Sequence, residues 1–243
     1  MPAAFWYDGA RVNFGCRLCR YIPARELHKG VFQVEERINQ GICYLVGAGL
    51  FGDGEIRKRP GDYVIAVDGG YRYCVERDIE ADLAVGDFDS LGSVPDFANI
   101  VRLKPEKDDT DMLHAANVGY DLGYRHFRIY GGTGGRLSHT MANIQLMNEF
   151  SCRGAGLVLV GEKSRIRVIT DGSWRFGAER SGMVSVFCLG DQAAGVTLRG
   201  LKYCGEDLTL TKEFPLGCSN EFTGRAGEIS VEQGSLLIVE ERE

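Results

Sequence analysis

The stretches YVIAVDGG (63–70) and DLAVGD (82–87) are the part of the sequence that decides the fold. Each is a short apolar run ending in Gly or Asp, which is typical of a buried parallel strand that enters a functional loop. Helical spacing follows at 111–122 and at 138–150, where Ser138 is the expected N-cap. This alternation predicts a mainly parallel sheet flanked by helices in αβα layers. Further strands are predicted at 42–48, 99–103, 126–132 and 156–161.

After about residue 163 the pattern changes to short strands separated by Gly and Asp-Gly turns, with no helical period. This pattern predicts an all-β domain, a small sandwich or barrel. We therefore divide the chain into an extension at 1–40, an α/β domain at 41–165 and a β domain at 166–243. The predicted strands of the β domain contain the runs RIRVIT, MVSVFCLG, GVTLRG, DLTL, EISVEQG and SLLIVEE.

Residues 1–40 show no clear period, and their role stays open between a true extension, a peripheral helix at 26–40 and a start codon placed too far upstream. Cys16 and Cys19 have C-x-x-C spacing, but a zinc site needs about four ligands. Two ordinary thiols are the simpler interpretation.

Composition excludes several classes of function. The net charge is −6 and no basic tract is present, which argues against nucleic-acid and acidic-membrane partners. The longest apolar runs are too short to span a bilayer. The first residues do not read as a secretory signal, and the eight cysteines form no regular framework. We expect a cytoplasmic protein with free thiols.

Two acidic motifs follow predicted strands. Asp87 and Asp89 are two residues apart, so in a strand their carboxylates would share one side and attract a divalent cation such as magnesium. The alternative is a solvated acidic turn. The segment KDDTD (107–111) follows the strand at 99–103 and opens a helix. Its aspartates are candidates for helix capping, but capping leaves the second acidic loop unexplained.

The glycine-rich segment GGTGGR (131–136) lets a backbone approach a phosphate, and Arg136 is able to clamp phosphate oxygens. His139 is a candidate general base, although a structural role is the simpler interpretation. In the β domain, LGCSNEF (216–222) is expected to be a polar turn in which Ser219 and Asn220 orient a ligand or merely shape the turn.

In this order the segments resemble the thiamin pyrophosphokinase family, also called thiamin diphosphokinase, in its bacterial form. The resemblance covers residues 42–243 and rests on Asp68-Gly69-Gly70, Gly86 to Ser90, Asp108 to Asp111, Gly131 to His139 with Asn143, and Gly217 to Glu221.

The resemblance implies a homodimer with active sites between subunits. It also implies magnesium-dependent transfer of the pyrophosphoryl group of ATP to thiamin, giving thiamin diphosphate and AMP. By the same resemblance Asp87, Asp89 and Asp111 hold Mg²⁺ and serve catalysis, and Ser219 and Asn220 contact thiamin. The residues expected around the nucleotide are Asp68, Asp108, Thr110, Gly134, Gly135, Arg136 and Asn143.

Two departures from the family pattern stand out. Ser138 replaces the usual Asp before His139, and no Trp follows Trp174 to stack on thiamin. Two alternatives stay open. A metal-dependent nucleotide-sugar transferase would use Asp87 and Asp89 but leaves the Ser219-Asn220 segment without a role. A catalytically inactive nucleotide- or thiamin-binding protein has only Ser138 in its favour.

Overall fold

The computed structural model describes residues 38–243, except 53, 93–94, 105–108 and 243. All of these residues belong to one compact unit, Ile38–Glu243. Cys16, Cys19 and nearly all of the predicted extension therefore lie outside the described residues.

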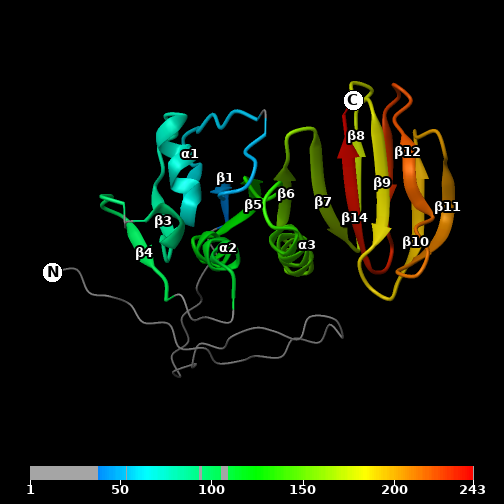
Figure 1. Ribbon diagram of the computed structural model, residues 1–243. Helices are drawn as coiled ribbons and strands as arrows, with labels where there is room; N and C mark the ends of the chain where they lie inside the picture. The colour runs from blue at the N-terminus through cyan, green and yellow to red at the C-terminus, as the bar shows by residue number, and fades with distance from the viewer. Residues whose placement is uncertain (1–37, 53, 93–94, 105–108, 243) are drawn as a thin grey trace. The chain divides into compact units, whose positions relative to one another are not determined.

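A six-stranded parallel sheet forms the first half of the described unit (Figure 1). Its strand order is β6-β5-β1-β2-β3-β4, so successive strands run outward from β1 in one direction and then resume on its other side with β5. The reversal creates a topological switch point between β1 and β5, the place where ligands bind in open parallel sheets. The strands are β1 (Asn39–Val46), β2 (Tyr63–Val67), β3 (Leu83–Gly86), β4 (Ile100–Arg102), β5 (Tyr124–Tyr130) and β6 (Gly156–Val160).

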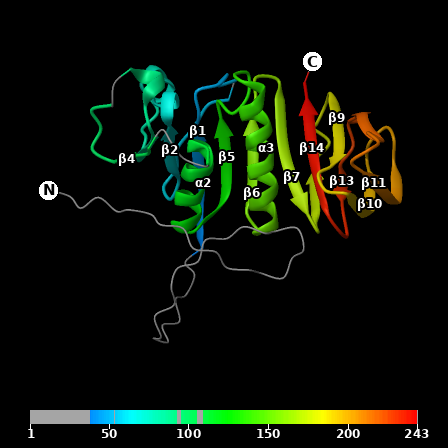
Figure 2. The ribbon, with the colours of Figure 1, turned by 60° about the horizontal axis from the view of Figure 1, so that its bottom comes forward.

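Helices cover both faces of this sheet (Figures 1 and 2). Alternate residues of β1 divide between two apolar clusters, as the two-residue period of a strand requires. Cys43 and Leu45 pack in the cluster that contains α2 (Asp111–Asp121) and α3 (Leu137–Cys152). Tyr44 and Val46 pack in the cluster that contains α1 (Tyr71–Glu76). The predicted αβα layers are confirmed.

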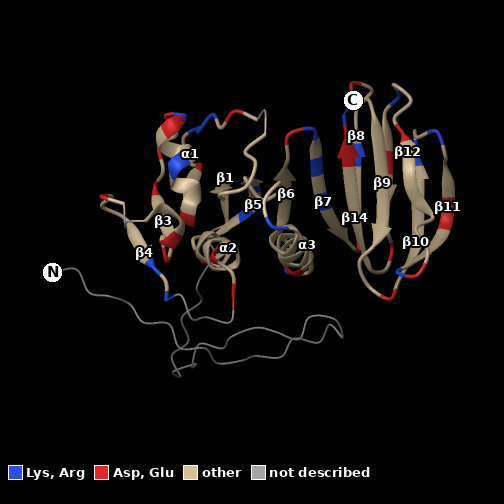
Figure 3. Cartoon of the chain, in the orientation of Figure 1, with Lys and Arg blue, Asp and Glu red and all other residues tan. Residues whose placement is uncertain are grey.

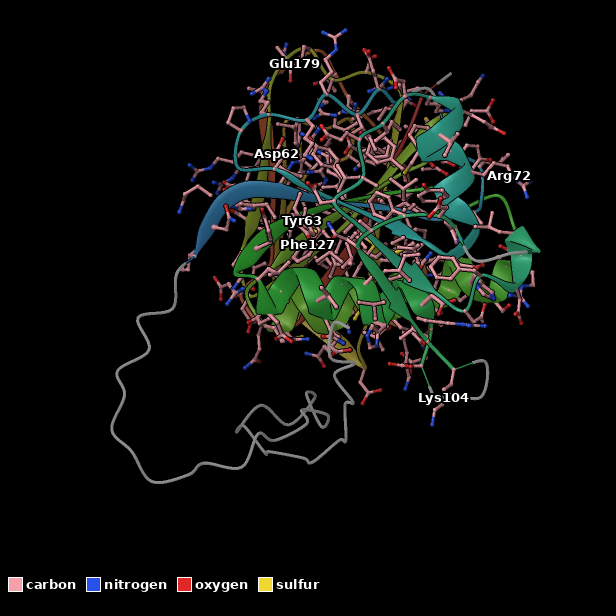
Figure 4. The ribbon with its side chains drawn as sticks, turned by 90° about the vertical axis from the view of Figure 1, so that its left-hand side faces the viewer. Asp62, Tyr63, Arg72, Lys104, Phe127 and Glu179 are labelled. Atoms are coloured by element: carbon pink, nitrogen blue, oxygen red, sulfur yellow. The ribbon has the colours of Figure 1, made fainter. Side chains whose placement is uncertain are left out.

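The helix-covered core is anchored by aromatic side chains. Phe127 of β5 meets Phe150 of α3 edge to face, with ring centroids 5.7 Å apart, and both side chains are buried. Figure 4 labels Phe127 between the sheet and the helices. Among the described residues, no helix is both long and apolar enough to cross a membrane.

The second half is a β-sandwich, as predicted, but one of its sheets continues the parallel sheet. β7 (Ser164–Thr170) pairs antiparallel with β6, and the sheet extends through β14 (Ser235–Glu241) and β9 (Met183–Cys188) to β12 (Gly217–Glu221). The predicted domain boundary at 165/166 falls inside β7. The second sheet has the order β11 (Gly205–Thr211), β10 (Gln192–Arg199), β13 (Gly227–Ser230), β8 (Ser173–Phe176).

Two local predictions were wrong. Residues 217–221 form the edge strand β12 rather than a turn, because they pair antiparallel with β9, with Asn220 opposite Val184. Ser138 is not the N-cap of α3, since the helix begins one residue earlier and Arg136 occupies the cap position without a side-chain cap.

Candidate active site

A cavity of about 550 Å³ lies at the carboxyl ends of the parallel strands, over the switch point. Segments after β1, β2, β3, β5 and the loop before α2 all contribute to its wall. Predicted site residues that line it are Asp68, Asp87, Asp89, Thr110, Asp111, Gly135, Arg136 and Asn143, and His139 lines it as well. Gly134 is not among the lining residues, and Asp108 lies outside the described residues.

Glycines on neighbouring loops let the backbone segments after β1 and β5 touch. A Cβ atom on Gly131 would lie 2.1 Å from the carbonyl oxygen of Gly47, and one on Gly49 would lie 2.2 Å from that of Thr133. The Gly49 N–H donates to the Gly131 carbonyl at 2.8 Å. Sequence reasoning missed Gly47 and Gly49, although two glycines at the end of the strand predicted at 42–48 and just beyond it were a usable signal.

Asn143 holds the glycine-rich loop in place. Its side chain is 5% exposed, and its Nδ2 donates to the Gly132 carbonyl at 2.8 Å. Arg136 and His139 are exposed and line the cavity just before and inside the first turn of α3. The structure thus brings a fixed backbone cradle, a helix amino terminus and a guanidinium to one wall, a combination suited to anionic ligands.

Three carboxylates also meet at this cavity. One oxygen each from Asp68, Asp87 and Asp111 lies within 4.8 Å of the others. Asp68 has a φ of 47°, a conformation that residues other than glycine rarely adopt, and its Oδ1 is buried without a hydrogen-bond partner. Two unit charges 4 Å apart repel by about 4 kcal/mol at an effective dielectric of 20. The cluster and the orphaned oxygen therefore fit a hard divalent cation.

Asp89 lies apart from this cluster because β3 ends at Gly86 and Phe88 takes a left-handed conformation with a φ of 61°. The sequence pattern predicts Asp87 and Asp89 as alternate residues of one strand, and the structure shows that they are not. Asp89 is exposed at the cavity wall, and its backbone N–H donates to Asp87 Oδ1 at 3.2 Å.

Thr110 is the N-cap of α2. Its Oγ1 accepts a hydrogen bond from the Leu113 N–H at 3.1 Å. The cap fixes the first turn of α2, and so fixes Asp111 beside the other two carboxylates.

Ser219 and Asn220 lie on β12, at the far edge of the ten-stranded sheet. Asn220 is 3% exposed, and its amide is bonded to the backbone: Nδ2 donates to the Tyr203 carbonyl at 2.7 Å, and Oδ1 accepts from the Tyr203 N–H at 2.9 Å. Ser219 is exposed in a left-handed conformation, while the Tyr203 side chain is 61% exposed. The structure does not bring β12 to the cavity within one chain.

A parallel sheet with a glycine-lined, carboxylate-bearing cavity at its switch point is the arrangement of α/β enzymes that bind phosphorylated ligands. The comparisons with known proteins specify the family. Residues 59–159 match the model described as thiamin pyrophosphokinase, catalytic domain, and residues 176–236 match thiamin pyrophosphokinase, vitamin B1 binding domain. Together the two ranges cover about two thirds of the chain. The chain belongs to the thiamin pyrophosphokinase family and is an enzyme.

Individual relatives agree with this assignment. The chain is 27% identical over 183 residues to thiamine pyrophosphokinase of Bacillus subtilis, covering 72% of this chain and 85% of the relative. The crystal structure of thiamin pyrophosphokinase from Geobacillus thermodenitrificans superposes with a TM-score of 0.72 at 27% identity, covering 83% of this chain and 98% of the other. The structure of the Bacillus subtilis protein, at 24% identity and a TM-score of 0.74, covers 84% and 100% and supports the fold.

Proposed function

We propose that the cavity over the β1/β5 switch point transfers the pyrophosphoryl group of ATP to the hydroxyethyl oxygen of thiamin, giving thiamin diphosphate and AMP. The observation that carries this proposal is the convergence of the acidic cluster and the glycine-rich loop inside the range matched by the catalytic-domain model. The match of residues 176–236, in the β-sandwich, to the vitamin B1 binding domain supports thiamin as the acceptor.

Asp87 and Asp111 are the proposed magnesium ligands, since each belongs both to the set expected from the family resemblance and to the close cluster. Asp89 is the third expected ligand, and Asp68 is the third carboxylate of the cluster. Magnesium would supply charge stabilisation at the phosphate oxygens. Without a bound cation, the negative charge of the acidic cluster would repel the triphosphate. We therefore expect nucleotide binding to depend on the metal.

The glycine-rich loop and Arg136 are proposed to hold the phosphates. Attack at the β-phosphorus makes AMP the leaving group, so negative charge grows on the β-phosphoryl oxygens and on the oxygen bridging to the α-phosphorus. Backbone N–H groups fixed by the Asn143–Gly132 hydrogen bond would meet that charge without reorganising. Arg136, at the start of α3, would add a charge-assisted hydrogen bond.

Tyr203 and Ser219 are proposed to contact thiamin, and Asn220 is proposed to position Tyr203 rather than touch the substrate. The exposed phenol ring offers a face to the cationic thiazolium ring, and cation–π contacts of this kind favour flat, charged ligands. The ring would fill the stacking position for which the chain has no Trp after Trp174.

The distance between the cavity at β1 and the proposed thiamin contacts at β12 supports a homodimer. Six inter-strand steps separate β12 from β1, roughly 29 Å at about 4.8 Å per step. Thiamin is too small to bridge that span within one chain. We therefore propose that β12 of one chain completes the cavity of a second copy. A cytoplasmic location is also proposed, in keeping with the six described cysteines, all of which are free.

Product analysis tests the reaction. The purified protein is incubated with ATP, magnesium and thiamin, and the products are followed by phosphorus NMR. Thiamin-dependent appearance of AMP and thiamin diphosphate is expected. ADP with thiamin monophosphate would overturn pyrophosphoryl transfer. Binding of both substrates without turnover, repeated with GTP, CTP and UTP, would favour the inactive binding protein instead.

A further inference from the structure

A second cavity, of about 510 Å³, lies outside the candidate active site. Its walls come from the turn between β6 and β7 (161–163), the start of β7, the connection between β8 and β9 (179–181) and the carboxyl end of β14. It shares no lining residue with the first cavity. The two are neighbours, because a Cβ atom on Gly161 would lie 3.3 Å from Oγ1 of Thr133. Figure 4 labels Glu179, which marks the β8–β9 connection.

Four basic and three acidic side chains line this cavity. Lys163, Arg165, Arg180 and Arg242 line the cavity, and Figure 3 shows basic bands along β7 beside the acidic carboxyl end of β14. Glu240 is the buried acid among them, 5% exposed. Its carboxylate is already shared by two arginines: Oε1 accepts from Arg167 Nη2 at 2.5 Å, and Oε2 accepts from Arg180 Nη1 at 2.8 Å.

The other three cations have no such partner. Within the described part of the chain, Lys163, Arg165 and Arg242 form no ion pair. The carboxylate of Glu179 points largely to solvent, 74% exposed, and reaches only Arg180, at 3.8 Å. Glu162 is exposed and makes no ion pair with any described residue. These three positive charges are therefore not neutralised by a directly contacting carboxylate.

Arg165 experiences the surrounding positive charge most directly. Burial lowers the pKa of its guanidinium, and the nearby charges of Arg242 and Arg180 lower it further, against an opposing effect of Glu240. A half-buried cation beside like charges is costly unless an anion approaches. Because the guanidinium fork matches phosphate oxygens, a phosphate-bearing ligand is the anion that these side chains are best built to bind.

We propose that this cavity binds the diphosphate group of a soluble metabolite, with Lys163, Arg165 and Arg242 as its cationic contacts. Three unpaired cations match the charge of a diphosphate better than that of a single phosphate. The hydroxyl groups of Ser164 and Ser181, on the same wall, are further donors. The site is independent of the proposed reaction, since it contains none of the carboxylates that would bind magnesium.

Inorganic pyrophosphate titrated into the full-length protein in the presence of EDTA tests the site by calorimetry. Without a metal the carboxylate cluster repels anions, so binding at the first cavity is suppressed, whereas a site of arginine and lysine needs no metal. We expect saturable binding, weakened at least ~10-fold in Arg165→Gln/Arg242→Gln, because each charge-assisted hydrogen bond lost is worth about that factor. Competition with ADP and with thiamin diphosphate then identifies which compound carries the group.

Arg72→Gln/Arg225→Gln is the matched control. It removes the same charge from two exposed positions outside the cavity and should leave the affinity within about twofold. Lys163→Gln, at an exposed position, is the second test variant should the double variant fold poorly, and it should also weaken binding. The proposal is overturned if pyrophosphate does not bind in EDTA, or if the cavity variants and the control bind it equally well.

Discussion

The side-chain amide of Asn220 makes two hydrogen bonds to the backbone of Tyr203, donating to its carbonyl at 2.7 Å and accepting from its N–H at 2.9 Å. The two residues are 17 positions apart, and the buried amide fixes where the exposed phenol ring of Tyr203 lies. This contact links the edge strand β12 to the loop after β10, and it makes Asn220 a positioning residue in the proposed thiamin site.

Tyr203→Leu is expected to raise the KM for thiamin by about 10-fold with a smaller effect on kcat, because it removes a cation–π contact worth roughly 0.5–2 kcal/mol. Tyr203→Phe keeps the ring face and should behave like the unaltered enzyme. Asn220→Ala should raise the same KM and, by leaving buried backbone groups unpaired, also lower the free energy of unfolding by about 1–3 kcal/mol. Equal KM values for Tyr203→Leu and Tyr203→Phe would remove Tyr203 from the site.

Asp87→Asn is expected to lower turnover by at least ~10²-fold, the scale on which one preorganised electrostatic group acts. We expect a similar loss of turnover for Asp89→Asn. Magnesium titrations of Asp68→Asn and Asp89→Asn should identify the third ligand: the variant that lacks it needs a higher magnesium concentration for half-saturation. Asp121→Asn, exposed at the end of α2, is the control. Near-normal magnesium-dependent turnover in Asp87→Asn would contradict the metal assignment.

Gly131→Ala is expected to destabilise the fold and distort the cavity. The residue has a φ of 63°, and an added Cβ would meet the Gly47 carbonyl oxygen at 2.1 Å. Gly154→Ala is the matched control, since its φ is 75° but nothing lies within 4 Å of the added Cβ. The control should cost about 1–2 kcal/mol of left-handed strain. Urea unfolding should show a clearly larger loss for Gly131→Ala, and equal losses would mean that the loops after β1 and β5 do not pack closely.

Thiol reactivity should follow burial. Burial raises the pKa of Cys74 to about 11, and burial together with Asp82 also raises the pKa of Cys43. A raised pKa keeps a thiol protonated, so at pH 8 these two thiols should resist iodoacetamide, and Cys74 should gain thiolate only as the pH approaches 11. Cys204 is exposed and lies outside β12, so it should react first. Peptide mapping that finds Cys74 alkylated as fast as Cys204 would contradict the core packing.

The elements that sequence alone predicts are those whose signals are local. The strands at 63–70 and 82–87 and the helix at 111–122 lie within a few residues of β2, β3 and α2, because apolar period and helix capping act over a few residues. The acidic and glycine-rich segments also come together as expected, since loops at the carboxyl ends of parallel strands must converge.

What sequence reasoning missed depends on contacts between distant residues. Residues 217–221 look like a polar turn, and only pairing with Val184 and Val186 makes them an edge strand. The left-handed conformation of Phe88 breaks the strand geometry after β3, so Asp89 does not join Asp87 in the close carboxylate cluster, and no local sequence pattern predicts that break. The parallel sheet continues into one sheet of the sandwich through the pairing of β6 with β7, and amino-acid composition does not predict that pairing.

Mixing two inactive variants tests most directly whether the cavity of one chain works with β12 of another. Asp87→Asn disables the cavity, and Tyr203→Ala/Ser219→Ala disables the proposed thiamin contacts, so each should be nearly inactive alone. After unfolding and refolding together in equal amounts, random pairing into two-fold dimers should restore about a quarter of normal activity, because half of the dimers then hold one intact site. A mixture no more active than its components, although heterodimers form, would show that each chain builds its site alone.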